Sequence, residues 1–233
     1  MKTNEPQYVI FKADDIREHP EDTLSPGWTR FCDLIAEADI TAALGLIGDS
    51  LVDPSDAYVD RLKGLASEAR FSFWNHGFDH HLKQTRDDGS VYSEFHNTSL
   101  EHQSNHLAET QRLTSEHLGL TLDTFGAPGN HSDDNTPVAL EAIPELSIWL
   151  YGDTRSKKHI LERTINVEHP THYPDFDAFS ESYQADIPVL TLQLHPSGWD
   201  DDRFNNFTSI VSFLKERDCV FTDPTEVVAK TAR

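Results

Sequence analysis

Short apolar runs alternate with longer amphipathic stretches from one end of the chain to the other. Apolar runs of this length, bounded by turn-forming residues, predict buried strands. They lie at residues 8–13, 42–47, 71–74, 124–127, 147–151, 160–167, 189–194 and 220–222. No repeat, low-complexity tract or linker-like segment divides the pattern, so we expect one domain over residues 1–233.

The stretches between these runs have the spacing of amphipathic helices. They predict helices at residues 26–38, 54–69, 100–118, 136–143 and 203–216. Ser25, Asp53 and Ser99 precede the first three helices as capping residues. Strands that alternate with helices predict an α/β protein with a parallel sheet, and seven or eight such repeats favour a closed barrel.

Acidic residues outnumber basic ones, with 40 Asp and Glu against 19 Lys and Arg and a formal net charge of −21. Such a surface repels phosphate backbones and anionic lipids, so we expect neither nucleic acid nor a membrane as a partner. No apolar run approaches the ~20 residues of a membrane helix, and the polar start of the chain differs from a secretory signal. Cys32 and Cys219 lie far apart in the sequence, which predicts two free thiols. We therefore expect a cytoplasmic protein, whose oligomeric state the sequence does not indicate.

Polar and turn-forming residues follow several of the predicted strands at the point where each strand ends. In a parallel barrel these carboxyl ends meet at one rim, where ligands bind. The residues concerned are Asp14-Asp15, Asn75-His76, Pro128-Gly129-Asn130, Asp153 and His195. Five segments that deliver such residues to one rim predict that the chain is an enzyme.

Two of these segments carry the residue types of a hydrolytic metal site. His76 and His80 are four residues apart, so one helical turn or a tight loop can present both imidazoles to one ion. Asp14 and Asp15 are adjacent carboxylates, of which one can bind a metal while its neighbour faces a water molecule. Taken alone, the first motif is compatible with a polar loop and the second with a solvated turn. Together, two imidazole nitrogens and one carboxylate form the ligand set of a hydrolytic metal centre.

His195 follows the apolar run 189–194 directly. A histidine at a strand end is well placed to donate a proton to a leaving group. The alternative is a structural histidine on the rim.

Four segments resemble the motifs of carbohydrate esterase family 4, the polysaccharide deacetylases. They are residues 12–16 (Lys-Ala-Asp-Asp-Ile), 76–80 (His-Gly-Phe-Asp-His), 126–128 (Gly-Ala-Pro) and 192–195 (Leu-Gln-Leu-His). The counterparts in the family are Thr-Phe-Asp-Asp-Gly, His-(Ser/Thr)-x-x-His, Arg-x-Pro and Leu-x-His. Order, spacing and position at strand ends all agree, and the resemblance extends over most of the chain.

The resemblance implies a fold, a metal and a set of roles. The fold would be a distorted (β/α) barrel of about seven strands. Asp15, His76 and His80 would hold one divalent ion, with zinc as the expected metal. Asp14 would be the catalytic base and His195 the catalytic acid, with Pro128 as a supporting residue of the third motif.

The chain departs from the family pattern at three points. Gly77 replaces the hydroxyl residue of the second motif, and Gly126 replaces the arginine that orients the base aspartate. Lys12 shares a strand face with Asp14, so its ammonium could stand in for that arginine. The alternative is that Lys12 lies lower in the barrel and pairs with a structural carboxylate. The aspartate that tunes the acid histidine has no clear counterpart. Position alone suggests Asp153, with Asp186 in reserve.

These features together predict a divergent, metal-dependent hydrolase that removes an acetyl group from a carbohydrate. The bond is an N-acetyl amide or, as a less favoured choice, an O-acetyl ester. One alternative is hydrolysis of another C–N bond, in a cyclic amide or ureide, on the same fold. The other is a non-catalytic barrel that binds sugar and retains the metal. Trp74, Trp149 and Trp199 lie nearest the predicted rim, where each can stack on a sugar ring or pack in the core.

Overall fold

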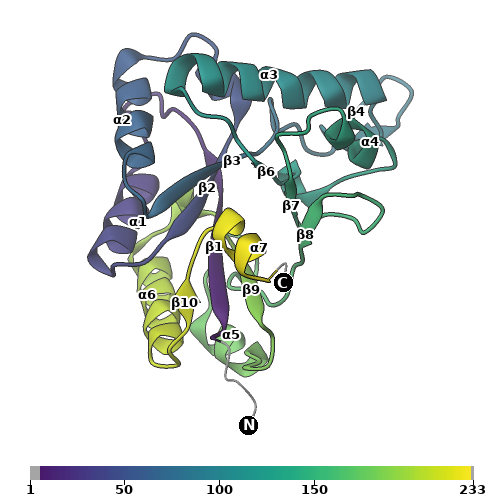
Figure 1. The fold of residues 1–233 in the computed structure, drawn as a ribbon. Helices are drawn as coiled ribbons and strands as arrows, with labels where there is room; N and C mark the ends of the chain where they lie inside the picture. The colour runs from purple at the N-terminus through teal and green to yellow at the C-terminus, as the bar shows by residue number, and fades with distance from the viewer. Residues whose placement is uncertain (1–5, 232–233) are drawn as a thin grey trace.

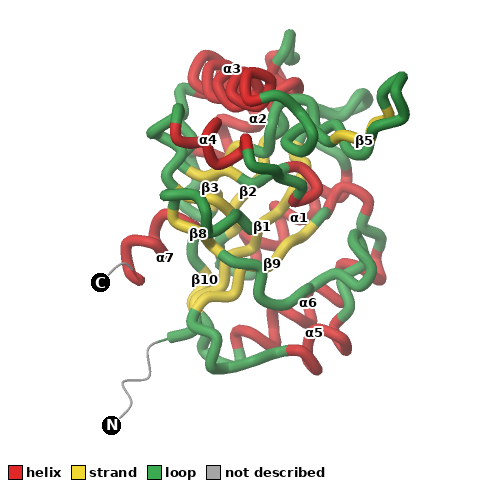
Figure 2. Tube along the Cα trace, turned by 90° about the vertical axis from the view of Figure 1, so that its right-hand side faces the viewer, coloured by secondary structure: helices red, strands yellow, loops and turns green. Residues whose placement is uncertain are grey.

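Eight parallel strands form one curved sheet in the computed structural model, which describes residues 6–231 (Figures 1 and 2). The strands are β1 (Tyr8–Ile16), β2 (Ala42–Leu46), β3 (Phe71–Asn75), β6 (Thr124–Phe125), β7 (Ile148–Leu150), β8 (His159–Leu161), β9 (Val189–Leu194) and β10 (Val220–Phe221). Their order is β10-β1-β2-β3-β6-β7-β8, and β9 pairs with β1. Among the described strands β8 and β9 share no ladder, so the barrel is open there. The expected distorted (β/α) barrel is confirmed.

Strand β1 is the centre of this sheet. Its residues Tyr8–Ala13 pair with β9, its first two residues also pair with β10, and its second half pairs with β2. The register against β2 shifts between Ala13 and Ile16, so the ladder carries an irregularity at Asp14 and Asp15. Asp15 has a φ of 73° at this point. An irregularity of this kind re-aims side chains, and here it brings adjacent carboxylates toward one rim.

Helices cover the outside of the sheet, as Figure 2 shows. They are α1 (Pro26–Glu37), α2 (Asp56–Ala66), α3 (Leu100–Leu118), α4 (Asn135–Glu141), α5 (Phe176–Ser182) and α6 (Asp201–Lys215). A further helix, α7 (Pro224–Thr231), packs against the inner face through Val227. Helices α5 and α7 and the small hairpin of β4 (Gln84–Thr85) and β5 (Val91–Tyr92) were not predicted from the sequence pattern. None of the described helices is long and apolar enough to cross a lipid bilayer.

The predicted helix starts are confirmed at two of three positions. The hydroxyl of Ser25 accepts a hydrogen bond from the backbone of α1, and that of Ser99 does the same for α3. Asp53 does not cap α2, because its backbone is left-handed, with a φ of 52°. Ser55 takes that role by accepting from the backbone N–H of Tyr58. Cys32 and Cys219 are buried free thiols, as expected.

The buried apolar residues form two clusters. The larger one fills the space between the sheet and the helices, and it includes Phe11 of β1 and Phe207 of α6. The smaller one contains Ile10, Trp74 and Val227. Ile10 and Phe11 are successive residues of one strand, so the second cluster lies on the opposite, inner face of the sheet. The barrel interior is therefore packed, and Lys12 is the next residue of β1 to point into it.

Candidate metal and acid–base site

The three predicted metal ligands meet at the carboxyl ends of β1 and β3. Asp15 comes from the irregular end of β1, and His76 and His80 come from the loop that follows β3. The Oδ1 atom of Asp15 lies 3.1 Å from Nε2 of His76 and 2.9 Å from Nε2 of His80. One ligand atom from each of the three residues lies within 4.8 Å of the others. The donor set and its spacing fit a divalent ion with N and O ligands.

A backbone carbonyl fixes the orientation of the His76 imidazole. Nδ1 of His76 lies 2.8 Å from the carbonyl oxygen of Gly126. A carbonyl oxygen only accepts, so Nδ1 carries a proton and Nε2 is the ring nitrogen that faces Asp15. This is the arrangement of metal-binding histidines, whose second nitrogen donates to a carbonyl or carboxylate.

The loop that carries His80 is shaped around the carboxylate of Glu94. Glu94 is buried, and it accepts hydrogen bonds from the backbone N–H groups of Phe78 and His80. Gly77 has a φ of 75°, and a β-carbon there would lie 2.6 Å from a Glu94 oxygen. Glycine therefore replaces the hydroxyl residue of the family motif because Glu94 occupies the space. His81 lies outside the cluster, since its side chain is 54% exposed and pairs with Asp79.

Electrostatics within the cluster favour an ionised Asp15. Burial raises the pKa of the Asp15 carboxyl, but the hydrogen bonds and charges of His76 and His80 outweigh it and hold the pKa well below its usual range. Burial lowers the pKa of His80, and the hydrogen bond with Asp15 reverses the effect, so that the net pKa is raised. The three groups thus interact strongly with one another.

Asp14 lies beside the cluster and is held by two neighbours. The ammonium of Lys12 lies 2.7 Å from Oδ1 and 2.6 Å from Oδ2 of Asp14, which confirms the expected contact. Gln193 of β9 donates a third hydrogen bond to Oδ2 at 2.7 Å. Asp14 Oδ2 is also 3.6 Å from Nε2 of His76 and 3.8 Å from Nε2 of His195. The carboxylate therefore lies between the metal cluster and the predicted acid.

The indole of Trp74 explains why the cation comes from β1 and not from β6. Lys12 is fully buried, and its Nζ lies 4.6 Å from the Trp74 ring centroid. A β-carbon at Gly126 would lie 2.7 Å from the same ring, and one at Gly45 would lie 2.4 Å from it. An arginine at position 126 would clash with Trp74. The lysine is placed instead so that its ammonium faces both a carboxylate and an aromatic ring, which attract it.

His195 is oriented by Glu168, and the predictions of Asp153 and Asp186 for this role were wrong. Nδ1 of His195 lies 2.6 Å from Oε2 of Glu168, and the backbone N–H of His195 donates to Oε1 at 2.8 Å. Asp153 pairs with Arg155 on the surface, and Asp186 is exposed. Burial lowers the pKa of His195, but the hydrogen bond that Nδ1 donates to Glu168 and the charge of Asp14 outweigh it, so the net pKa is raised.

The third motif supports the site through a residue that sequence reasoning did not select. Pro128 is buried and begins a short 3-10 turn (Pro128–Asn130), but no hydrogen bond of a side chain involves it. Asn130, at the end of that turn, donates to Oε1 of Gln193 at 3.1 Å. Gln193 in turn donates to Asp14, so Asn130 fixes the orientation of an amide that contacts the base candidate. The sequence did hold a signal for Gln193: it lies two residues before His195, so the two side chains share one face of the strand.

The tryptophans near the rim pack in the core. Trp74, Trp149 and Trp199 are 0%, 1% and 6% exposed. Tyr173 is the exposed aromatic residue of the loop that supports His195, with 47% of its surface accessible. It follows His172, whose ring centroid lies 4.5 Å from that of His195. Trp74, Trp149 and Trp199 therefore expose no ring face on which a ligand could stack.

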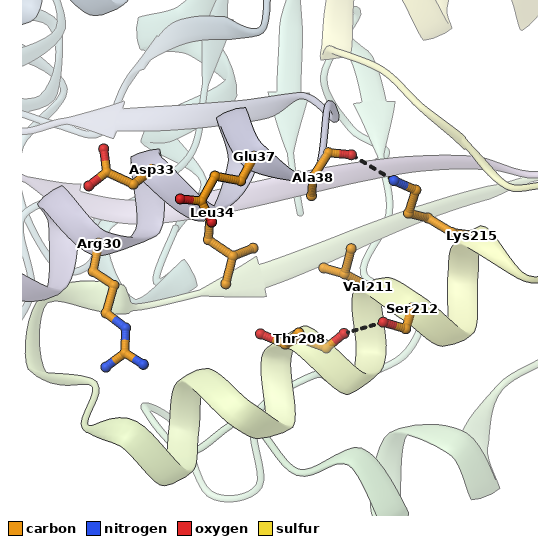
Figure 3. Close-up of a pocket in the computed structure, with 9 residues that line it drawn as sticks. All are labelled: Arg30, Asp33, Leu34, Glu37, Ala38, Thr208, Val211, Ser212 and Lys215. Carbon is orange, nitrogen blue, oxygen red and sulfur yellow. Dashed lines mark hydrogen bonds between the residues drawn. The ribbon is translucent and has the colours of Figure 1, made fainter.

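A hollow opens directly beside the metal cluster. It has a volume of about 320 Å³, and its lining includes Asp15, His80, Arg17, His19 and Ser197. This is at the lower end of the roughly 300–1,000 Å³ typical of small-molecule sites. A larger hollow of about 560 Å³ lies between α1 and α6, lined by residues such as Arg30 and Lys215 (Figure 3). It contains none of the candidate site residues.

Comparison with known proteins identifies the fold. No protein-family model matches the sequence, and no curated protein sequence does. Among solved structures, the chain is similar to the Xyl-CE4 domain of a multidomain xylanase from the hindgut metagenome of Trinervitermes trinervoides. The TM-score is 0.67 at 12% identity, over 97% of this chain and 92% of that one.

Two further structures with the same fold are an esterase and a pseudoenzyme. One is a family 4 acetyl xylan esterase from Clostridium thermocellum in complex with a cobalt ion, with a TM-score of 0.66 at 13% identity over 96% of this chain and 91% of that one. The other is a carbohydrate esterase family 4 pseudoenzyme from Bacillus anthracis, with a TM-score of 0.66 at 13% identity over 96% of this chain and 65% of that one. At these identities the likeness establishes the fold, which is that of carbohydrate esterase family 4.

Proposed function

We propose that this protein is a divergent member of carbohydrate esterase family 4 and a metal-dependent hydrolase that removes acetyl groups from a carbohydrate. The observation that carries the proposal is the meeting of five residues at one rim. Asp15, His76 and His80 offer three ligand atoms within 4.8 Å of one another. Asp14 and His195 face each other beside them, with Asp14 Oδ2 and His195 Nε2 3.8 Å apart.

The metal site we propose uses Asp15, His76 and His80, with Zn²⁺ as the resident ion. The mixed nitrogen and oxygen donors support this choice, because imidazole and carboxylate both bind zinc. A divalent ion held there supplies Lewis acidity, which polarises the acetyl carbonyl and makes a water molecule more acidic. The chain itself contributes orientation: the Gly126 carbonyl holds His76, and the Glu94 carboxylate holds the loop of His80.

Asp14 is the group we propose as general base. Its two oxygens already accept hydrogen bonds from Lys12 and Gln193, so the carboxylate is held in one orientation while it takes a proton from water. The Lys12 ammonium contacts both oxygens and so restrains the whole carboxylate group. Lys12 is therefore a positioning residue, which acts on the reaction through Asp14.

His195 is the group we propose as general acid. Glu168 accepts from Nδ1, so the imidazole presents Nε2 toward the site, and a protonated ring can donate from Nε2 to the departing amine or alcohol. The raised pKa of His195 supports this role, because the acid must carry its proton at the start of the reaction. Amide substrates should depend on this proton more than activated esters, whose leaving groups depart without it.

The test is release of acetate from N-acetylated and O-acetylated oligosaccharides, measured with and without a chelator. We expect release that stops on chelation and returns with Zn²⁺. Asp14→Asn and His195→Ala should each lower the rate by about 10²–10⁴-fold. His159→Ala, which removes an exposed histidine of β8, is the matched control and should leave the rate unchanged. For His195→Ala, the loss should be larger on the amide than on an activated ester.

Two outcomes would replace this proposal. A protein that binds Zn²⁺ but releases acetate from none of these substrates is non-catalytic, which a pseudoenzyme among the similar structures makes a concrete alternative. Hydrolysis of a cyclic amide or ureide without any acetate release would assign the site to another C–N bond.

A further inference from the structure

A second group of metal-binding residue types lies next to the candidate site and shares no residue with it. Asp79, Glu94 and His106 each offer one ligand atom, and these three atoms lie within 4.8 Å of one another. Asp79 comes from the loop after β3, Glu94 from the segment before α3, and His106 from α3 itself, which runs along the top of Figure 1. Three separate segments therefore converge on one point.

Both carboxylates of this group accept backbone hydrogen bonds, and each also contacts a histidine ring. Nδ1 of His106 lies 2.9 Å from Oε1 of Glu94 and 3.9 Å from Oδ2 of Asp79. The side chain of Glu94 is fully buried, and that of Asp79 is 19% exposed. Within residues 6–231, the ion-pair partners of these two carboxylates are histidines alone. Asp14, by contrast, has the permanent cation of Lys12.

An unpartnered imidazole adjoins the group. The rings of His102 and His106 are stacked one turn apart on α3, with centroids 3.9 Å apart. Nε2 of His102 is inaccessible to solvent and has no hydrogen-bond partner among the described residues. A buried polar atom without a hydrogen-bond partner is uncommon in proteins, and each one calls for an explanation. The ring of His102 packs against that of His106, which is one of the three candidate ligands.

We propose that Asp79, Glu94 and His106 bind a second divalent cation of the zinc class. Two carboxylates and an imidazole are a common mixed donor set for such ions, and the nitrogen disfavours Ca²⁺ and Mg²⁺, which prefer oxygen ligands alone. The ion would connect the loop of His80 to α3. Because Glu94 also accepts from the backbone N–H of His80, this second site would hold the loop that presents His80 to the first site.

The experiment counts bound metal. Protein stripped with a chelator is loaded with Zn²⁺, freed of excess by gel filtration, and analysed for zinc per chain by mass spectrometry. We expect two equivalents in the wild type and one in His106→Ala. Asp79→Asn, an isosteric change at a partly exposed side chain, should also retain one. His117→Ala, on the last turn of the same helix, is the matched control and should retain two.

The first site is emptied independently with Asp15→Asn, which should retain one equivalent. Adding His106→Ala to that variant should leave none. One equivalent in the wild type that persists in both His106→Ala and Asp79→Asn would overturn the proposal. Two equivalents that persist in both variants would overturn it as well, because the extra ion would then be bound elsewhere. The count does not depend on acetate release, so failure of the proposed function leaves this test intact.

Discussion

Replacing Lys12 by methionine would remove the only permanent cation that contacts Asp14 among the described residues. Methionine keeps most of the length and the apolar stem of lysine, so the packing against Trp74 changes little. Burial lowers the pKa of the Lys12 ammonium although Asp14 opposes this, so the charge is held in place at a cost. After the substitution, Asp14 stays 1% exposed and loses its partner at 2.6 Å.

The expected loss of stability follows from the burial of both partners. Breaking a buried ion pair by removing one partner typically costs about 3–5 kcal/mol. We therefore expect Lys12→Met to lower the free energy of unfolding by about 3 kcal/mol at neutral pH.

The assay is a double-mutant cycle in urea at neutral pH, with unfolding followed by circular dichroism and fluorescence. Asp14→Asn alone leaves a buried ammonium without its carboxylate and should also destabilise. The variant with both changes should be more stable than the sum of the single losses predicts, because neither charge is then left unpaired. We expect a coupling of about 3 kcal/mol. A coupling below about 1 kcal/mol would refute the view that the Lys12–Asp14 pair is a unit.

Three further predictions concern the surroundings of the pair. Glu168→Gln should lower the raised pKa of His195 and move the alkaline limb of the pH–rate profile to lower pH, because it removes the carboxylate 2.6 Å from Nδ1. Gly126→Arg should lower the free energy of unfolding by about 1–3 kcal/mol, measured in urea, because the new side chain meets Trp74. Asp153→Ala should leave the pH–rate profile of hydrolysis unchanged, because Asp153 pairs with a surface arginine and not with His195.

Each of these has an outcome that contradicts it. An unmoved alkaline limb in Glu168→Gln would mean that another group sets the protonation of His195. The raised pKa of His195 also makes the free energy of unfolding depend on pH. The stabilisation from His195 is complete below about pH 6.5 and is lost as the pH rises through the pKa of His195 in the folded state. A Gly126→Arg variant as stable as the wild type would mean that Trp74 moves aside. A shifted limb in Asp153→Ala would restore that residue as the partner of His195.

Position at strand ends carried most of the prediction of the site. Asp14, Asp15, His76 and His195 each follow an apolar run, and parallel strands place such residues at one rim whatever lies between them. The same argument predicted the Lys12–Asp14 contact, since alternate residues of a strand share a face. That prediction required only the two-residue alternation of side chains along a strand.

The partners that were missed lie in loops, where no period applies. Glu168 follows a stretch predicted as strand 160–167, but the strand ends at Leu161 and the rest is irregular. Its contact with His195 joins positions 27 residues apart through a loop conformation that local sequence does not specify. Glu94 is similar: it is one acid among 40 acidic residues, and only the fold shows that it occupies the space above Gly77.

The indole of Trp74, which packs against Lys12, restricts how this site can change by mutation. An arginine at position 126 requires the volume that Trp74 fills, and any side chain at Gly45 requires it too. Reducing Trp74 first leaves a cavity that costs about 3–5 kcal/mol, and removing Lys12 first leaves Asp14 buried without a cation. Any single substitution on the way from Lys12 to an arginine at position 126 therefore gives a less stable protein. Lineages that acquired this lysine should retain it together with the tryptophan and both glycines, as one inherited unit.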